Sequence, residues 1–261
     1  MKIEIKDKLK KILFSHEEDD NSICKTFSKA LRENVDLNNA QLNNADLSGI
    51  TLFQEKLNNV SFHKADLSNT KFICCEFYNC SFDASNFSNS SCDETIFNSC
   101  SFSHTNFKNS DFSKTNLQYS IFKNATFLET NLKRSNLSYT NLKNAKFINV
   151  DLQSVDLSFS YIDSTIFQSA NLRGVVFDGS FIAGTSFTNS CLSGADFCNC
   201  WIFSSFFENT IFAGATFNSV SIDNIDISIF NLAYVDVKGM RVVENAANIY
   251  AIKEKQYNDN P

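Results

Sequence analysis

The feature that most constrains this chain is a period of five residues. In the segment NLKRSNLSYTNLKNAKF, four large apolar residues are spaced five apart: Leu132, Leu137, Leu142 and Phe147. A strand repeats every 2 residues and a helix every 3.6, so neither produces this spacing. The period runs unbroken from Leu37 to Leu232, and its 40 centres comprise 19 Phe, 15 Leu, 5 Ile and one Cys. Such a repeat indicates one continuous repetitive domain.

Two further positions follow the same period. Two residues before each centre, 36 of the 40 positions hold Ala, Ser, Thr, Cys or Val. Two residues after a centre stand all seven glycines of the chain, and Asn occupies many of the other places in that column, such as Asn39 and Asn109. Gly and Asn both tolerate the positive φ of a tight turn. The chain is therefore expected to turn once in every five residues, with the large and the small residue pointing inward.

Four such turns close a square coil of about 20 residues, and coils stack about 4.8 Å apart when they hydrogen-bond like neighbouring strands. The pattern predicts an all-β solenoid of about ten four-sided coils, a rod roughly 48 Å long at that spacing. Outward side chains that lie one coil apart should then form columns along the rod.

The stretches QLNNADL, TNLKRSNLSYTNL and SGADF resemble the repeat A(D/N)LXX of the pentapeptide-repeat proteins. The resemblance covers about 200 of the 261 residues. It implies a right-handed quadrilateral β-helix, and the handedness comes from the resemblance alone.

A solenoid needs caps at both ends. We expect helical caps at residues 1–34 and 237–261, on either side of a repeat domain at 35–236. In the N-terminal segment DDNS offers helix-capping residues, and two apolar helical faces are predicted, one of Ile5, Leu9, Ile12 and Leu13, the other of Ile23, Phe27, Ala30 and Leu31. The stretch VVENAANIYAIKEKQ predicts the C-terminal helix.

Composition narrows the classes of function. The formal net charge of −6 argues against general nucleic-acid binding, which relies on Lys and Arg at phosphates. No stretch approaches the roughly 20 apolar residues that cross a membrane, and the N-terminus does not read as a signal peptide. With nine cysteines, these features indicate a reducing cytoplasm and free thiols.

We expect no enzyme activity, cofactor or metal. The three histidines, His16, His63 and His104, are far apart, and no nucleophile, phosphate-binding or metal-ligand motif appears. Four of the cysteines fall in the small inward column and are interpreted as core residues rather than a disulfide or metal site: Cys75, Cys80, Cys100 and Cys200.

One outward column is aromatic where polar residues are usual, and it predicts an exposed patch of Tyr161, Phe181, Trp201 and Phe203 beside Ala183. Exposed aromatic patches are typical of interaction surfaces. Alternatively, the C-terminal tail folds back and covers the patch. Phe206 and Ile211 extend the apolar character around the same coils, which favours a homodimer formed through the C-terminal third.

A second outward face carries acidic side chains: Asp36, Glu76, Asp156, Asp178, Asp196 and Asp236. In some pentapeptide-repeat proteins a charged rod imitates duplex DNA and occupies the DNA-binding saddle of gyrase or topoisomerase IV. Alternatively, these aspartates belong to the repeat motif and only solvate a face. Seven of the eleven basic residues between Leu37 and Asp236 fall between Lys108 and Lys146, so negative charge is continuous only in the C-terminal third.

The sequence favours a non-enzymatic protein–protein interaction module that uses the aromatic patch. The alternatives are a DNA-mimic modulator of type II topoisomerases, acting through the acidic face, and a bacterial secreted effector, which rests on the resemblance alone.

Overall fold

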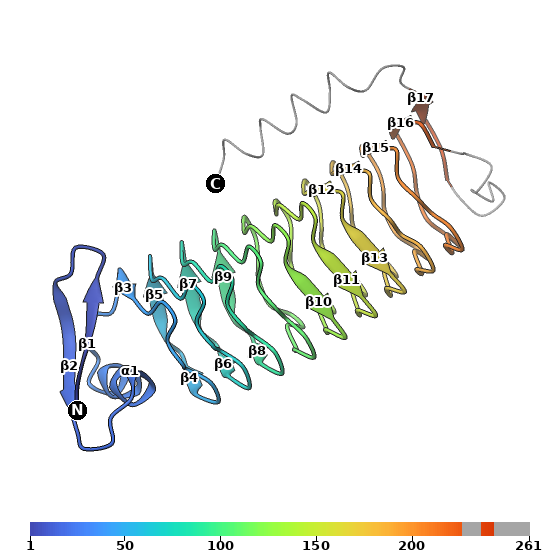
Figure 1. The fold of residues 1–261 in the computed structure, drawn as a ribbon. Coiled ribbons are helices and arrows are strands. Elements are labelled where there is room, and N and C mark those ends of the chain that lie inside the picture. The colour runs from blue at the N-terminus through green and yellow to red at the C-terminus, as the bar shows by residue number, and fades with distance from the viewer. Residues whose placement is uncertain (226–235, 243–261) are drawn as a thin grey trace.

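The computed structural model describes residues 1–225 and 236–242 of the chain. They form a β-solenoid of about nine turns, seen as a row of stacked coils with the N-terminus at one end (Figure 1). The Cα partners in neighbouring coils are equivalent positions of the repeat, four pentapeptides apart, as in Leu52 with Phe72 and Phe72 with Cys92. The predicted all-β solenoid with four-sided coils is confirmed.

The strands of the coils are short and pair in parallel with the equivalent strand of the next coil. One face holds β4 (Thr51–Phe53), β6 (Lys71–Ile73) and β8 (Ser91–Asp93), and another holds β5 (Lys56–Asn58), β7 (Glu76–Tyr78) and β9 (Ile96–Asn98). A third holds β10 (Thr126–Leu128), β11 (Lys146–Ile148) and β13 (Ile166–Gln168). The fourth holds β12 (Tyr161–Asp163), β14 (Phe181–Ala183), β15 (Trp201–Phe203), β16 (Ser221–Asp223) and β17 (Arg241–Val242).

The repeat centres form the core, as predicted. Each one from Leu37 to Ile222 is at most 6% exposed. Because equivalent centres lie one above another, their rings stack along the rod: Phe62 on Phe82 at 4.9 Å between ring centroids, and Phe82 on Phe102 at 5.0 Å. The core is thus a set of side-chain columns parallel to the rod axis.

The turns lie two residues after each centre, also as predicted. Asn39 has φ 65° and Gly49 has φ 71°, and the same left-handed backbone recurs at this position throughout the described coils. Asn and Gly occupy many of these corners because they adopt positive φ at little cost.

The small inward column has a role beyond saving space. Many of its hydroxyls donate hydrogen bonds to the backbone carbonyl of a centre in the preceding coil, such as Thr165 to Leu142 at 2.8 Å and Ser180 to Leu157 at 2.7 Å. The Leu142 carbonyl also accepts the turn hydrogen bond of the Ala145 N–H. These side chains therefore connect many of the corners to the coil before them.

The N-terminal cap differs from the prediction in its first half. The face of Ile5, Leu9, Ile12 and Leu13 does not form a helix; β1 (Lys2–Asp7) and β2 (Ile12–Glu17) make an antiparallel hairpin instead. Its turn is stabilised by the Asp7 carboxylate, which accepts the N–H groups of Leu9 and Lys11. β1 then pairs with β3 (Ala40–Gln41) of the first coil. A helix could not satisfy the backbone groups along that open edge, whereas a strand can.

The second half of the cap is the predicted helix, α1 (Ile23–Arg32). Ser22 is its N-cap and accepts the Lys25 N–H. Phe27 is buried and meets Phe62 of the first coils edge to face at 6.3 Å. The helix therefore covers the core where the rod begins.

At the other end the repeat extends beyond residue 236, where we expected the cap to start. β17 pairs with β16 in the same register as the other coils, so Arg241 and Val242 belong to the solenoid and not to a cap. The predicted C-terminal helix lies outside the described residues.

We predict that Phe97→Ala destabilises the protein by about 3–5 kcal/mol, the range for removing a buried Phe. Phe97 stacks on Phe77 at 4.9 Å and contacts Phe72, Phe82 and Phe102 edge to face. Urea denaturation followed by circular dichroism measures the loss. The control is Lys71→Ala on an exposed strand position, which should change the free energy of unfolding by at most about 0.5 kcal/mol. Equal effects of the two substitutions would contradict this account of the core.

Candidate functional site

The predicted aromatic patch is not exposed. Tyr161, Phe181 and Phe203 are 0%, 1% and 4% exposed, and with Ala183 they form a second apolar cluster, separate from the core, against which Trp201 packs. The prediction of an open interaction surface at this place is wrong. The sequence left open the alternative that the C-terminal tail covers the patch. That tail lies outside the described residues.

These side chains point outward, as their register predicted, because they flank the inward Ile162, Ile182 and Ile202 on β12, β14 and β15. Tyr161 and Phe181 stack at 5.4 Å between ring centroids. Other outward apolar side chains of these coils remain in solvent, with Phe206 60% and Ile211 57% exposed. Burial is therefore a property of this one face and not of outward aromatic residues in general.

A charged pair borders the buried cluster. The Asp163 carboxylate, itself buried, accepts a hydrogen bond from the Tyr161 hydroxyl at 3.3 Å and pairs with the Lys143 ammonium at 3.1 Å. A buried carboxylate is stable only when it is paired in this way. The cluster is thus an ordered part of the structure.

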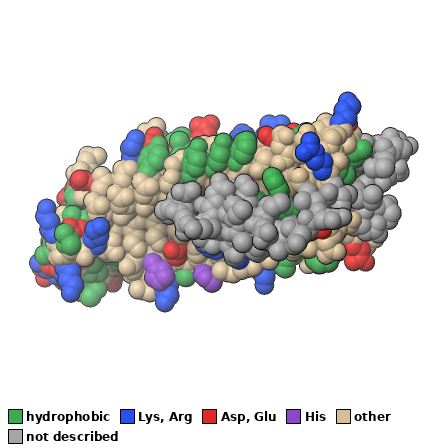
Figure 2. Space-filling model, turned by 90° about the horizontal axis from the view of Figure 1, so that it is seen from above, with side chains coloured by type: hydrophobic (Ala, Val, Ile, Leu, Met, Phe, Trp, Pro, Cys, Tyr) green, Lys and Arg blue, Asp and Glu red, His purple; other side chains and the backbone are tan. Residues whose placement is uncertain are grey.

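The exposed aromatic surface lies elsewhere, at a corner of the rod. Hydrophobic side chains gather in a row along one edge of the molecule in the space-filling view (Figure 2). Tyr119, Tyr139 and Phe159 stand at equivalent corners of successive coils and are 48%, 45% and 42% exposed. Their rings stack at 5.0 and 5.1 Å between centroids. We call these three residues the aromatic ladder.

The backbone conformation of the three ladder residues indicates that the fold does not require aromatic side chains there. The three residues occupy corner positions with φ of 60°, 60° and 55°. Bulky residues are uncommon at positive φ, where each side chain costs roughly 1–2 kcal/mol. Stacking returns about 0.5–1.5 kcal/mol for each of the two pairs of rings, which offsets only part of that cost. Rings exposed to solvent at such positions favour a role in binding.

The ladder ends in one direction at Gly179, the next corner of its column. A Cβ at Gly179 would lie 2.5 Å from the Phe159 ring, so only glycine leaves room for that ring.

Sequence reasoning missed the aromatic ladder, although a signal was present. Outward aromatic side chains were expected only at positions flanking the centres, and the corners were expected only to turn the chain. Reading every fourth corner would have found Tyr119, Tyr139 and Phe159 in a column that otherwise holds Asn, Ser and Gly.

The acidic residues lie on one face, as predicted, but they do not form a continuous column. Asp156, Asp196 and Asp236 alternate with Val176 and Thr216 in successive coils. Nearer the N-terminus the column begins with the exposed Asp36, continues with Lys56 and reaches Glu76, whose carboxylate pairs with the Lys56 ammonium at 2.8 Å. Hydrogen bonds from Lys56 and Tyr78 hold the pKa of Glu76 below its ordinary value.

The remaining carboxylates are engaged locally. Asp178 accepts a hydrogen bond from the Asn199 side chain at 2.7 Å, and Asp156 accepts the Ser158 N–H. Burial opposes ionisation of Asp196, but its hydrogen bonds from Cys198 and Thr216 outweigh this and lower its pKa. These contacts fit the reading of Asp as a turn-stabilising residue of the repeat.

The charge density along this column is also below that of a DNA strand. From Asp156 to Asp236 the column spans four coils, about 19 Å at the strand spacing. One strand of duplex DNA carries about 6 charges over that length, whereas this column carries three carboxylates.

The four cysteines of the small inward column lie in the core, as the sequence predicted. All nine cysteines are free, and Cys75, Cys80, Cys100 and Cys200 are buried. The Cys200 thiol donates to the Phe177 carbonyl at 3.0 Å, as the hydroxyls of its column do. Within residues 1–225 and 236–242, no three His, Cys, Asp or Glu side chains are grouped to hold a metal. The same residues include no helix that is long and apolar enough to cross a membrane.

Comparison with known families identifies the repeat. A family model described as a pentapeptide repeat region matches residues 106–177. A second model, of eight pentapeptide repeats, matches residues 56–89, 75–113 and 165–200. The chain belongs to the pentapeptide-repeat family.

Two solved pentapeptide-repeat structures are similar to this protein. HetL from the cyanobacterium Nostoc sp. strain PCC 7120, involved in the regulation of heterocyst differentiation, is 15% identical with a TM-score of 0.61, covering 83% of this chain and 91% of HetL. QnrB1, a plasmid-mediated fluoroquinolone resistance protein solved after trypsin treatment, is 18% identical with a TM-score of 0.53, covering 79% of this chain and 98% of that one. At these identities the likeness shows the fold, a right-handed quadrilateral β-helix. The search of curated proteins gave no match.

We predict that this pentapeptide-repeat protein loses stability in mild alkali because of its buried thiols. Burial raises the pKa of Cys92 and Cys200 well above that of a free cysteine. The free energy of unfolding should stay level below about pH 8.5, the ordinary thiol pKa. It should fall above that pH, because the unfolded state releases thiol protons that the folded state retains.

Urea denaturation at a series of pH values between 8 and 9.5 measures the effect. The control is Cys92→Leu with Cys200→Thr, since Leu and Thr occupy equivalent positions in other coils. A decline of the same slope in the control would show that these two thiols are not its source.

Proposed function

We propose that this protein is a non-enzymatic protein-binding rod and that the aromatic ladder is its contact surface. The observation that carries the proposal is the exposure of Tyr119, Tyr139 and Phe159 in one stacked column on a rigid corner. Tyr is among the residues that contribute most to protein interfaces. It replaces the contact surface predicted from sequence, where Tyr161, Phe181 and Phe203 are buried.

The geometry suits binding for a physical reason. Association costs the conformational entropy of each side chain that becomes ordered. The rings of the aromatic ladder are already held by stacking on their neighbours and, at one end, by the close approach of Phe159 to Gly179. A partner would therefore meet an ordered apolar strip and lose little entropy on its side of the contact.

Charge around the strip indicates the kind of partner. Lys114 and Arg134 are exposed at the neighbouring corner of the same coils, within the stretch where most basic residues of the repeat fall. A basic border favours a partner that places acidic residues around an apolar centre and raises its association rate.

Topoisomerase binding by DNA mimicry stays a prediction, as do the homodimer, the cytoplasmic location and the secreted-effector role. The broken acidic column and its low charge density do not favour mimicry. The likeness to QnrB1 concerns the fold alone.

The test of the proposed function is the triple substitution of Tyr119→Asn, Tyr139→Asn and Phe159→Asn. Peptide display against the wild-type protein supplies binders, and their dissociation constants are then measured by calorimetry with both proteins. We expect at least a tenfold loss of affinity, since interface aromatic residues each contribute about 1 kcal/mol or more. Stability should be preserved because Asn accepts positive φ.

The matched control is Lys114→Asn with Arg134→Asn, which changes exposed corner residues of the same coils and leaves the rings in place. It should weaken binding less than the triple variant does, and mainly at low salt. If the triple variant binds every selected peptide as tightly as the wild type, the aromatic ladder is not the contact surface.

A gyrase supercoiling assay separates the proposal from DNA mimicry. We expect no inhibition by the wild-type protein. Inhibition that is lost on Asp156→Asn, Asp178→Asn and Asp196→Asn, and kept in the triple aromatic variant, would replace the proposed function with mimicry.

A further inference from the structure

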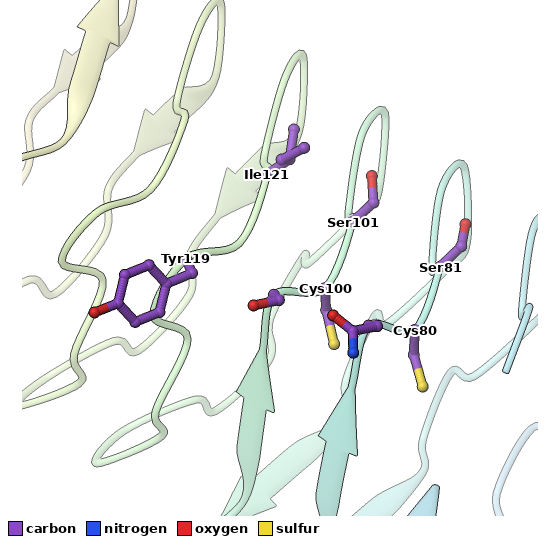
Figure 3. A pocket seen from close by; sticks show the side chains of 8 residues that line it. Cys80, Ser81, Cys100, Ser101, Tyr119 and Ile121 are labelled. Carbon is purple, nitrogen blue, oxygen red and sulfur yellow. The ribbon is translucent and has the colours of Figure 1, made fainter. Parts of the chain in front are cut away.

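A cavity of about 330 Å³ adjoins the aromatic ladder at its N-terminal end. Its walls include Tyr119 and Ile121 on one side and small polar residues of the two preceding coils on the other: Asn79, Ser81, Ser99 and Ser101. Figure 3 shows the Tyr119 ring and the Ile121 side chain at one end of the site, with Ser101 and Ser81 in successive coils beyond them.

The cavity lies where the aromatic ladder would continue. Tyr119 stacks on Tyr139 with one face of its ring, and the corners that precede Tyr119 in the same column are Ser99 and Asn79. A small side chain at Ser99 leaves open the place that a ring would occupy there. Since neighbouring rings of the aromatic ladder are about 5 Å apart, a planar ring entering this space can stack on the remaining face of Tyr119.

The charge and polarity of the lining residues indicate which kind of ligand fits the cavity. The Asp83 carboxylate accepts hydrogen bonds from the hydroxyls of both Ser81 and Ser101, so negative charge borders the cavity. No Lys or Arg is among the lining residues. A phosphate would be repelled here, whereas an uncharged ring with a hydrogen-bond donor finds the Ser99 hydroxyl, the Asn79 amide and the apolar Ile121 side chain.

Cys80 and Cys100 also line the cavity, but their thiols do not supply its binding groups. Cys80 and Cys100 are buried, and in Figure 3 their sulfurs point away from the Ser81 and Ser101 hydroxyls. The Cys100 thiol is hydrogen-bonded to the Phe77 carbonyl inside the coil. Burial also raises its pKa well above that of a free cysteine, which keeps it protonated and unreactive.

We propose that this cavity binds an aromatic side chain of a partner polypeptide, stacked on Tyr119 as a fourth rung of the aromatic ladder. The inference rests on the proposed function, because it assigns to the same surface a specific pocket for one anchoring residue. Tyr or Trp fits best, since each joins a flat apolar ring to one hydrogen-bond donor. Such an anchor, set in a pocket beside a flat strip, is a common arrangement in protein interfaces.

The first test uses N-acetyl-tryptophanamide as the probe and follows the Tyr119 ring resonances of protein labelled at its tyrosine rings, assigned with Tyr119→Asn. We expect a saturable upfield shift of these resonances, with a dissociation constant in the millimolar range. N-acetyl-leucinamide should bind at least tenfold more weakly. Equal shifts with both amides would overturn the proposal, and tighter binding of adenosine monophosphate would reassign the pocket to nucleotides.

The decisive variant is Ser99→Tyr, which fills the cavity with an aromatic side chain of the protein itself. It should fold, because Tyr119 and Tyr139 adopt the same corner backbone, and circular dichroism with a urea titration checks this. We expect at least a tenfold loss of probe affinity. The matched control, Asn109→Tyr, adds the same side chain at an exposed corner of another column and should leave probe binding unchanged.

Failure of the pocket can be told from failure of the proposed function. If Ser99→Tyr folds and binds both the probe and the selected peptides like the wild type, while the triple aromatic variant binds the peptides weakly, the pocket inference is wrong and the aromatic ladder remains. If the triple variant also binds the peptides normally, both are wrong. Loss of probe and peptide binding in Ser99→Tyr alone, with Asn109→Tyr unaffected, supports the pocket.

Discussion

The structure depends on backbone hydrogen bonding between coils in a constant register of four pentapeptides. Because every bridge between coils joins equivalent positions, each inward side chain lies on another inward side chain, and each corner lies on another corner. The hydroxyls of the small column reinforce this register from inside, as Thr165 does at the Leu142 carbonyl. An insertion of a single residue would move the large side chains from the inward centres to the neighbouring outward positions, which explains why the phase of the repeat is unbroken.

The same register produces the candidate site. Coils are spaced so that equivalent side chains lie about 5 Å apart, which is also a favourable distance for stacked rings. Three aromatic residues at successive corners therefore become an ordered strip without any loop or dedicated domain. Where the column changes from Tyr119 to Ser99 the strip stops and a cavity opens, so one change of side-chain size in a column makes a pocket.

Much of this could be predicted from the sequence, and the errors have identifiable causes. The core of Phe and Leu centres, the corners at Asn and Gly, and helix α1 with its Ser22 cap all follow from local patterns. The segment from Ile5 to Leu13 fits a helical face as well as it fits two short strands, and the open edge of the first coil decides for the strands. The aromatic ladder was missed because corners were treated only as turns, although they also carry side chains on the outside.

The sequence by itself determined the direction in which almost every side chain of the repeat points, because a period of five with four turns to a coil assigns each residue to a face or a corner. It did not determine which outward residues reach solvent. Tyr161 and Phe181 point outward and are buried, whereas Tyr119 and Tyr139 point outward and are exposed. Direction is set by local backbone geometry, but exposure depends on what lies against a face. The repeat pattern does not contain that information, and only the tertiary structure decides it.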